Sequence, residues 1–313
     1  MRVLVTGGAG FIGRWLVKRL IDEKKHVIAL DDLSNGRMEN ISEFKDNHMF
    51  EFIKGDIRNE DIVESLHWND YNIVYHLAAE INVQKSLDNP SETFQRDVVG
   101  TFNILEQCRK HKIKFVFMSS CMVYDRCFDE HGITENHSVK PASPYAAAKL
   151  SGEYLTLSYY YSYQLPTVVL RPFNIYGPYQ KSTGEGGVIA IFIKRTLNNE
   201  PLLVYGDGTQ TRDFLYVEDC VDFIIKAGES ERTLGQIINV GTGEDIHINQ
   251  LAKLISKDPQ LIKHVPHIHP QSEIMKLKCD SSKAHDLLDW KPSYELKTGL
   301  ERTKDWINNN LNL

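Results

Sequence analysis

The sequence has few cysteines, and they form no pattern typical of a cross-linked or metal-binding protein. Five cysteines are scattered over 313 residues, and no two of them form a CxxC pair. An odd, dispersed set of this kind argues against a disulfide framework and against a zinc site. The reducing cytoplasm is therefore the compartment that we expect.

The sequence also lacks a long apolar run and an excess of positive charge. No apolar run approaches the ~18 residues that a membrane span needs. The opening "MRVLVTGG" reads as a strand rather than as the charged and apolar regions of a signal peptide. The net charge of −6 weighs against a phosphate-rich partner, because such partners require a concentrated basic surface. We therefore expect no nucleic-acid partner and no membrane partner.

Short apolar runs alternate with helical patterns through the first half of the chain. The runs are "RVLVTG", "HVIALDD", "FEFIKGD", "NIVYHLA", "KFVFMSS" and "TVVLRPF". Segments with a periodicity of 3.6 residues lie between them, such as Phe11–Glu23 and Thr93–His111. Buried strands that alternate with helices predict a doubly wound parallel sheet, hence an α/β fold of the Rossmann type.

The alternation stops after "RPFNIYGP", and a smaller mixed α/β substrate-binding lobe is expected from there. A loop over 177–187, a helix over 188–198 and a strand over 202–205 follow, and the tail contains two or three helical segments. We predict a cleft between the two lobes. The predicted Rossmann lobe comprises 1–174, with 212–243 returning to it, and the second lobe comprises 175–211 and 244–313.

A glycine-rich turn joins the first strand to the first helix. "VLVTGGAGFIG" places Gly7, Gly10 and Gly13 where a tight turn lets backbone N–H groups approach a pyrophosphate. Asp31 ends the second strand at the distance expected for a carboxylate that binds an adenosine ribose. This acid, with Asp32 beside it, would repel a 2′-phosphate, so the pattern favours NAD over NADP; Arg37 is a mild signal in the other direction.

A tyrosine and a lysine in "SPYAAAKLSGEYL" form the candidate catalytic pair. Tyr145 and Lys149 stand four residues apart on a predicted helix, so both side chains lie on one face. A phenol must lose its proton to act as a base, and a neighbouring ammonium group, helped by the positively charged nicotinamide, lowers its pKa. Ser120, at the end of an upstream strand, is the candidate for the hydroxyl that holds the substrate oxygen.

With these motifs the chain resembles the extended short-chain dehydrogenases/reductases, in particular the NAD-dependent nucleotide-sugar epimerases and dehydratases. The motifs are "TGGAGFIG", "GDIRN", "HLAAE", "SSCMVY", "SPYAAAK", "RPFNIYGP", "YGDGTQTRDFLYVED", "NVGTG" and "DLLDWKPS", in the order of the family. The resemblance implies that Tyr145 is the base for the sugar 4-hydroxyl, with Lys149 as its helper and Ser120 as the clamp. The expected cofactor contacts are Gly7, Gly10, Phe11, Ile12, Asp31, Asp32, Asp56, Ile57, Leu77, Ala78, Tyr145 and Lys149.

The resemblance also implies a UDP-sugar substrate and a homodimer joined by a four-helix bundle. It places Asn174 and Arg212 on the diphosphate, Val188 at the nucleoside, Tyr205 on the base and Glu273 on a ribose.

The chain departs from the family pattern at several positions. Asp97 stands where an asparagine is usual, and "HIHPQSEI" lacks the usual arginine, for which His267 or His269 is a candidate substitute. His264, His267 and His269 lack the carboxylate or cysteine partners of a metal site, so no metal is predicted.

Cys121 and Met122 stand where the family's 4,6-dehydratases usually carry an acid pair. Since a thioether cannot usefully donate a proton, these residues argue against a standard 4,6-dehydratase. They are compatible with space-filling residues of a 4-epimerase. They also resemble the family branch that handles 5,6-unsaturated sugars, in which Cys121 would protonate C5 and Met122 would line the substrate site. A non-catalytic nucleotide-binding regulator is disfavoured because Ser120, Tyr145 and Lys149 are all present.

Overall fold

The structure, a computed structural model, describes residues 1–127, 130–183, 187–267 and 273–310. Contacts divide the chain into two compact units. The first comprises Met1–Val123, Pro141–Arg171 and Val221–Ile238, and the second comprises Tyr124–Lys140, Pro172–Cys220 and Asn239–Leu313.

This division differs from the predicted one at the segment Tyr124–Lys140, which we expected in the first lobe. The segment belongs to the second unit because Asn239 holds it at two points. The Tyr124 hydroxyl donates to Asn239 Oδ1 at 2.7 Å, and Asn239 Nδ2 donates to the Ile133 carbonyl at 2.8 Å.

A seven-stranded sheet forms the centre of the first unit, as the alternation of strands and helices predicted. Its strand order is β11-β6-β5-β4-β1-β2-β3, and the pairings from β1 to β6 are parallel. This is a Rossmann-type order, so the predicted fold class is confirmed. The strands are β1 (Arg2–Thr6), β2 (His26–Asp31), β3 (Phe50–Lys54), β4 (Ile73–His76), β5 (Lys114–Met118), β6 (Thr167–Pro172) and β11 (Ile237–Val240).

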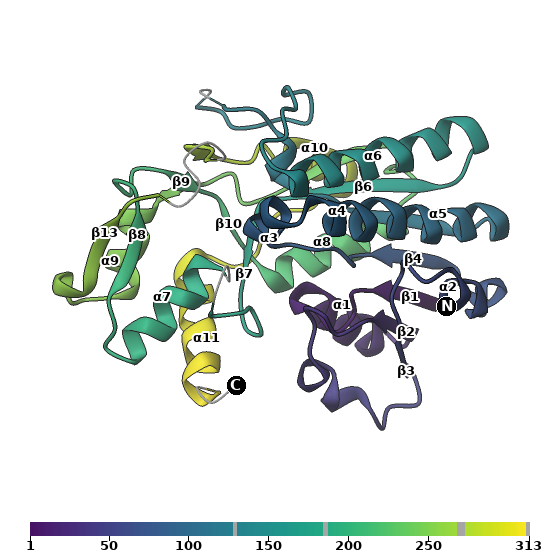
Figure 1. Ribbon diagram of the computed structural model, residues 1–313, viewed down its shortest axis with the longest axis horizontal. Coiled ribbons are helices and arrows are strands. Elements are labelled where there is room, and N and C mark those ends of the chain that lie inside the picture. Colours follow the sequence, from purple (N-terminus) through teal and green to yellow (C-terminus); the bar gives the residue numbers. More distant parts are fainter. Residues whose placement is uncertain (128–129, 184–186, 268–272, 311–313) are drawn as a thin grey trace. The chain divides into compact units, whose positions relative to one another are not determined.

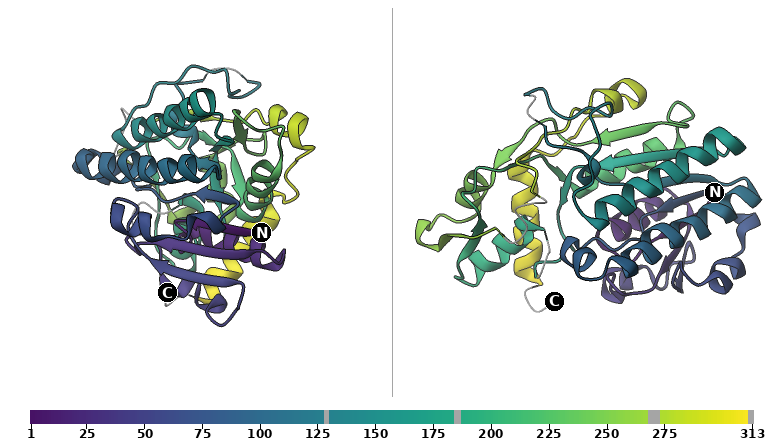
Figure 2. Two further views of the ribbon diagram at one scale, coloured as in Figure 1. Left: turned by 90° about the vertical axis from the view of Figure 1, so that its right-hand side faces the viewer. Right: turned by 45° about the horizontal axis from the view of Figure 1, so that its top comes forward.

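Helices cover both faces of this sheet, with α5 and α6 on one face and α1 on the other (Figures 1 and 2). The helices are α1 (Phe11–Asp22), α2 (Glu60–Ser65), α3 (Val83–Asp88), α4 (Pro90–Phe94), α5 (Gly100–His111), α6 (Pro144–Tyr163) and α8 (Val217–Glu229). Short 3₁₀ turns are η1 (Met38–Asn40), η2 (Ser42–Phe44), η3 (Trp68–Asp70) and η5 (Cys121–Val123).

The helix predicted over Thr93–His111 is interrupted. A π-helical turn, η4 (Gln95–Val99), separates α4 from α5. Turns of this kind are rare and occur often at functional sites. Periodicity alone does not reveal them, because one wider turn leaves most of the apolar spacing intact.

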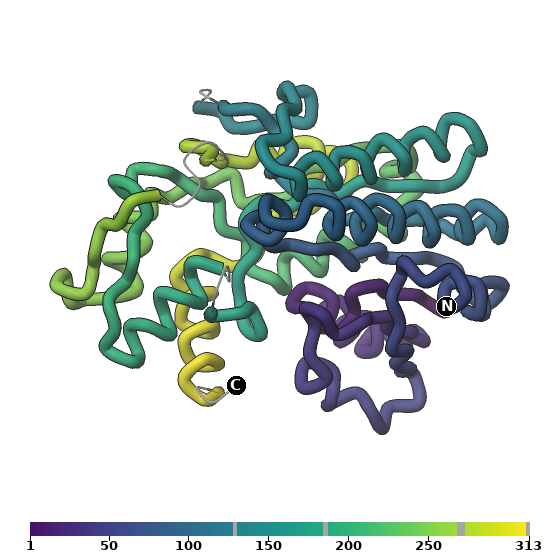
Figure 3. The backbone as a smooth tube through the Cα atoms, in the orientation of Figure 1, coloured from purple at the N-terminus to yellow at the C-terminus, as the bar shows by residue number. Residues whose placement is uncertain are grey.

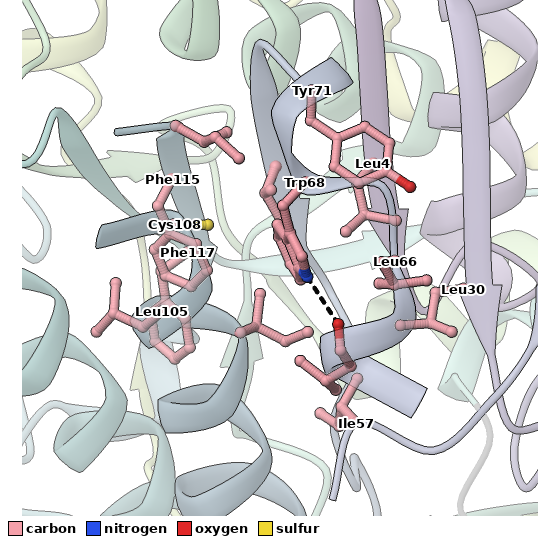
Figure 4. Packing of buried hydrophobic residues seen from close by; sticks show 14 of the residues in the cluster. Leu4, Leu30, Ile57, Leu66, Trp68, Tyr71, Leu105, Cys108, Phe115 and Phe117 are labelled. Carbon is pink, nitrogen blue, oxygen red and sulfur yellow. Dashed lines mark hydrogen bonds between the residues drawn. The ribbon is translucent and has the colours of Figure 1, made fainter. Parts of the chain in front are cut away.

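The core between α5 and the sheet is aromatic and aliphatic (Figure 4). Phe115 and Phe117 of β5 are buried beside Leu105 and Cys108 of α5. Trp68 is buried as well, and its indole N–H donates to the Val63 carbonyl at 2.7 Å. Phe117 belongs to the strand that precedes the turn at Cys121–Val123, so this core anchors the strand from which the turn follows.

The second unit is built from small sheets and helices, and Figure 3 traces its backbone. Strand β8 pairs with β13 in parallel, β10 pairs with β7, and β9 lies between β12 and β14. These strands are β7 (Asn174–Tyr176), β8 (Leu202–Tyr205), β9 (Thr211–Arg212), β10 (Phe214–Tyr216), β12 (Ile246–His247), β13 (Ile262–Val265) and β14 (Lys276–Leu277). The helices are α7 (Val188–Leu197), α9 (Ile248–Ile255), α10 (Ser282–Leu288) and α11 (Leu296–Asn309), with a 3₁₀ turn η6 (Pro259–Leu261).

Within the residues that the structure describes, no helix has both the length and the apolar character needed to cross a lipid bilayer.

Candidate active site

The turn between β1 and α1 is formed by backbone that only glycine permits. Gly7 has φ of +72°, and a Cβ atom there would lie 2.8 Å from the Ala78 backbone nitrogen. A Cβ atom on Gly13 would lie 2.1 Å from the Gly7 carbonyl oxygen. The turn therefore places the N-terminus of α1 so that the backbone N–H groups of its first turn can donate hydrogen bonds to a phosphate group.

Asp31 braces this turn from the end of β2. Its Oδ2 accepts from the Ala9 N–H at 3.0 Å, and its Oδ1 accepts from the Leu33 N–H at 2.8 Å. Burial raises the pKa of Asp31, and the two backbone hydrogen bonds oppose that rise. The carboxylate thus lies at the strand end where the sequence placed it.

Asp32, the second acid of this strand end, is held by an arginine that the sequence analysis did not single out. Asp32 Oδ2 lies 3.4 Å from Arg96 Nη1, and its Oδ1 accepts from the Ser34 hydroxyl at 2.6 Å. Because Arg96 comes from the π-helical turn, this ion pair ties that turn to the end of β2.

The remaining predicted cofactor residues surround the same turn. Phe11 and Ile12 form the half-buried first turn of α1. Leu77 and Ala78 follow β4, and the Ala78 N–H donates to Thr6 Oγ1 at 3.3 Å. These positions are compatible with the predicted contacts.

Asp56 and Ile57 follow β3, and they differ in burial and in contacts. Burial disfavours the charged form of Asp56, but hydrogen bonds from Arg58 outweigh burial and lower its pKa. One of these bonds joins Arg58 Nη2 to Asp56 Oδ2 at 2.6 Å. Ile57 is buried against Gly100. Asp56 is therefore a half-buried carboxylate paired with Arg58, and Ile57 is a core residue.

Tyr145 lies in the first turn of α6, as predicted. The Ser143 side chain caps the helix by accepting from the Ala146 N–H at 3.2 Å, and Pro144 opens its first turn. Tyr145 is buried, and its phenol lies close to the Ser120 hydroxyl. Burial raises the pKa of Tyr145, the Ser120 hydroxyl opposes this, and the charges of Asp97 and Cys121 raise it further.

The predicted effect of Lys149 on the tyrosine is not found in the protein chain by itself. Lys149 is absent from the causes that shift the pKa of Tyr145. Its ammonium group instead donates to the Met118 carbonyl at 3.0 Å and lies 5.4 Å from the centre of the Phe117 ring. Burial lowers the pKa of Lys149, whereas Asp97 and Glu153 raise it. Burial dominates in the chain alone, and the expected lowering of the tyrosine pKa, which includes the charge of the bound nicotinamide, stays a prediction.

Cys121 opens the 3₁₀ turn that follows β5. Cys121 is only 3% exposed, and it lies close to Tyr145. Met122 is half-buried, and its N–H donates to Ser120 Oγ at 3.2 Å. The structure thus brings Ser120, Cys121 and Tyr145 together, with Met122 next to them in the chain.

A buried ion pair that the sequence analysis missed supports this turn. Arg171 Nε donates to Glu153 Oε1 at 2.8 Å and Arg171 Nη2 donates to Glu153 Oε2 at 2.5 Å. The Ser119 hydroxyl donates to the same carboxylate. A signal was present in the sequence, because Glu153 follows Lys149 by four residues and thus lies on the same face of α6.

In the second unit, three predicted substrate residues form one cluster. Arg212 Nη2 is ion-paired with Glu273 Oε1, and His267 Nε2 lies 2.7 Å from Glu273 Oε2. The Tyr205 ring is exposed, and its centre lies 5.9 Å from the centre of the His267 ring. His267 therefore contacts Glu273 in the region where the family's arginine is missing, whereas His269 lies outside the described residues.

The other two predicted substrate residues are half-buried. Asn174 begins β7, and its Nδ2 donates to the Asp213 carbonyl at 3.2 Å. Val188 is the first residue of α7. Asp213, which the sequence analysis did not select, is fully buried and accepts from the Thr242 N–H at 2.8 Å and from the Gly243 N–H at 2.9 Å. Burial raises the pKa of Asp213 to about 6, against these hydrogen bonds. This carboxyl group thus holds the "NVGTG" loop.

No group of three or more metal-ligating side chains occurs among the described residues. His264 contacts Asn249 Oδ1 at 2.9 Å and His267 contacts Glu273, so these two histidines have different partners.

Comparison with known proteins agrees with this geometry. A family described as GDP-mannose 4,6 dehydratase matches residues 4–303. The chain belongs to this family.

Solved structures of the family cover the chain almost completely. The chain is 54% identical to a protein named Pal from Bacillus thuringiensis, with a TM-score of 0.97, over 99% of this chain and 100% of that one. It is 34% identical to UDP-glucose 4-epimerase from Thermotoga maritima, solved with UDP-glucose, with a TM-score of 0.92 and coverage of 99% and 100%. It is 32% identical to UDP-glucose 4-epimerase from Thermus thermophilus, solved with NAD, with a TM-score of 0.90 and coverage of 98% and 99%.

The family consists of nucleotide-sugar epimerases and dehydratases, which are enzymes, and its cofactor is NAD. The glycine-rich turn fits that cofactor, because side chains at Gly7 and Gly13 would collide with neighbouring backbone and disrupt the tight turn that a pyrophosphate needs. The predicted family, enzyme class and cofactor are therefore confirmed.

Proposed function

We propose that the protein is an NAD-dependent isomerase of an unsaturated UDP-sugar. It converts UDP-6-deoxy-GlcNAc-5,6-ene into UDP-4-keto-6-deoxy-L-AltNAc, as in pseudaminic acid synthesis. The observation that carries the proposal is the Cys121 thiol, buried beside Tyr145 in the turn after β5, with a methionine next to it instead of an acid.

The first half of the proposed reaction removes hydrogen from C4 of the sugar. Tyr145 takes the proton of the 4-hydroxyl, Ser120 holds the same oxygen, and Lys149 supplies positive charge near the phenol. The nearness of the Tyr145 and Ser120 hydroxyl groups supports these roles, because one sugar oxygen can then contact both of them.

NAD, when bound, accepts the C4 hydride and returns it, in this proposal to C6. The substrate thus loses a proton from O4 and a hydride from C4, and it gains a hydride at C6 and a proton at C5. The 5,6 double bond becomes a single bond and the 4-hydroxyl becomes a ketone. The product is an isomer of the substrate, and no further oxidant or reductant is consumed.

Cys121 supplies the C5 proton in this scheme. A thiol has an ordinary pKa near 8.5, which suits proton transfer to carbon at neutral pH better than an alcohol does. Met122 has no proton to give, so loss of a hydroxyl from C6 would lack its acid. The proposed substrate has no C6 hydroxyl, so no acid is required at that position.

The nucleotide part of the substrate is assigned to the second unit. Arg212 offers a planar fork of donors that suits a diphosphate, together with the Asn174 amide. Tyr205 has an exposed ring that can stack on the base, and Val188 lines the nucleoside pocket. Glu273 holds the ribose, and its present partners Arg212 and His267 orient the carboxylate.

The first unit is assigned to the cofactor. The N-terminus of α1 binds the pyrophosphate, and Asp31 binds the adenosine ribose.

The protein is proposed to form a dimer through α5 and α6. Phe102 on α5 and Tyr154 on α6 are 44% and 59% exposed, and their burial against a second copy would be favourable. Leu105 and Tyr159, which lie on the same two helices, are buried in the first unit and belong to its core. Light scattering at micromolar concentration checks the assembly, and a clean monomer would contradict it.

The experiment that tests the reaction uses D₂O. The purified protein is incubated with NAD and, separately, with UDP-GlcNAc, UDP-glucose and the 5,6-unsaturated UDP-sugar, and the products are analysed by NMR. The proposal predicts turnover of the unsaturated sugar only, with deuterium at C5 and a 6-methyl group. Loss of water from UDP-GlcNAc, or no reaction with the unsaturated sugar, would contradict it.

The second candidate is a UDP-glucose or UDP-GlcNAc 4-epimerase. It is favoured by the names of the Thermotoga and Thermus proteins, which match the chain over nearly its whole length. In the same experiment a 4-epimerase would yield the 4-epimer of a saturated UDP-sugar, with no deuterium on carbon.

A further inference from the structure

A buried carboxyl group beside the candidate catalytic pair has an oxygen with no hydrogen-bond partner. Asp97 is 2% exposed, and its Oδ1 accepts from the Glu80 N–H at 2.7 Å. Its Oδ2 is also buried, and within the described part of the chain it has no hydrogen-bond partner. Such an atom is costly to bury, so its retention calls for an explanation.

The backbone holds this carboxyl group in place from several sides. Asp97 lies in the π-helical turn Gln95–Val99, and its carbonyl accepts from the Thr101 hydroxyl at 2.6 Å. Because Thr101 donates there, it must accept from His76 Nε2, which lies 2.9 Å away. His76 Nδ1 then accepts from the Thr6 hydroxyl at 2.8 Å. Burial lowers the pKa of His76 to about 3, so this imidazole is neutral.

Among the charged groups around Asp97, Lys149 is the cation that most favours the ionised form of Asp97. The π-helical turn that carries Asp97 packs against α6, which carries Lys149. Lys149 favours ionised Asp97 more than Arg96 does, and Arg96 is already paired with Asp32. The neighbouring acid Glu80 acts in the opposite direction. Of the two carboxyl groups that act on Lys149, Glu153 is bound by Arg171, whereas Asp97 forms no ion pair with an arginine among the residues that the structure describes.

We infer that Asp97 is a positioning residue that provides the counter-charge for Lys149 and thereby sets the pH range in which the Tyr145–Lys149 pair works. An asparagine, which the family resemblance leads one to expect here, would have the same shape but no charge. The inference rests on the proposed roles of Tyr145 and Lys149, but the coupling of charges that it describes does not depend on the substrate.

The coupling has a definite direction for each partner. Ionised Asp97 stabilises the ammonium form of Lys149, against the burial that lowers its pKa. The same charge disfavours the phenolate of Tyr145. Removal of the charge should therefore lower the pKa of both groups, so that the pH range of hydride removal moves downward as a whole.

The test measures Lys149 directly, without substrate. Protein labelled with [ε-¹³C]lysine is titrated by NMR, and the Lys149 signal is assigned by its loss in Lys149→Met. In Asp97→Asn the midpoint for Lys149 is expected to fall by about one pH unit, the usual size of such perturbations in folded proteins. Asp88→Asn is the matched control, since Asp88 is exposed on the adjacent α3. An unchanged Lys149 midpoint in Asp97→Asn would overturn the inference.

A second measurement needs no variant of Asp97. Burial raises the pKa of Asp97 to about 6. The Lys149 signal of the wild-type protein should therefore show a separate inflection near that pH, when its counter-charge appears. A flat signal below pH 7 would contradict the coupling. Failure of the proposed reaction in the D₂O experiment would leave both titrations as predicted, so the two proposals fail separately.

Discussion

Two turns of the first unit, each at the carboxyl end of a parallel strand, are held in different ways. The turn after β1 is held by backbone, since Gly7 and Gly13 allow contacts that any side chain would block. The turn after β5 is held by side chains, because Ser119 and Arg171 converge on the buried Glu153. The first turn suits the cofactor that all members share, whereas the second can change its residues and hence the reaction.

The largest effect is expected from breaking the support of the second turn. Arg171→Met leaves Glu153, which is 0% exposed, as an unpaired buried charge. Removing one partner of a buried ion pair costs about 3–5 kcal/mol of unfolding free energy. Urea unfolding should therefore show a marked loss of stability. The double variant Glu153→Gln/Arg171→Met removes both charges and should recover part of the loss; a double variant as unstable as Arg171→Met would contradict this account.

A smaller effect with a defined pH dependence is expected at Asp97. Its pKa is raised from 3.8 to about 6 in the folded protein, so the neutral form favours folding. The contribution of neutral Asp97 to the free energy of unfolding is present in full below the unfolded pKa of 3.8. It is lost as the pH rises through the folded pKa of about 6. Asp97→Asn removes that loss, and at pH 7 it should gain up to about 3 kcal/mol relative to wild type.

The matched measurement is the unfolding free energy of both proteins at pH 4 and pH 7. The difference between the variant and the wild type should grow in favour of the variant with rising pH. A difference that is the same at both pH values would show that Asp97 does not titrate between them.

The smallest effect is expected at the first turn, where backbone carries most of the support. Asp31→Ala removes two hydrogen bonds to the turn and the predicted contact with the adenosine ribose. Hydrogen bonds to a charged group contribute about 1.5–3 kcal/mol, so NAD should bind about 10- to 150-fold more weakly. Calorimetry with NAD and NADP checks this, and the preference for NAD should decrease. A wild-type protein that prefers NADP would contradict the reading of β2.

The two turns also differ in how far the sequence predicts them. Gly7 and Asp31 follow from local patterns, because a strand, a glycine turn and an amphipathic helix are adjacent in the chain. The support of the second turn joins Ser119, Glu153 and Arg171. The sequence indicates only that Glu153 shares a helix face with Lys149. It does not predict Arg171 as the partner of Glu153, because tertiary packing brings these two residues together.

The same reason explains the other differences from the sequence-based predictions. The cluster of Arg212, His267 and Glu273 joins residues that are far apart in the chain, so their mutual contacts had to come from the fold. Asp97 is visible in the sequence as a departure from the family. Its burial and its unpaired oxygen depend on the π-helical turn, which the apolar periodicity conceals.

The central claim is that the Cys121 thiol delivers a proton to C5. The most direct measurement mixes Cys121→Ser with NAD and the 5,6-unsaturated UDP-sugar in D₂O, and follows NADH absorbance together with deuterium at C5. Serine is nearly isosteric but a poor acid, so turnover should fall by about 10²–10⁴-fold while NADH still forms and then persists. Tyr145→Phe, as the matched variant, should form no NADH. Turnover of Cys121→Ser at close to the wild-type rate, with deuterium at C5, would contradict the claim and leave the thiol as a space-filling residue.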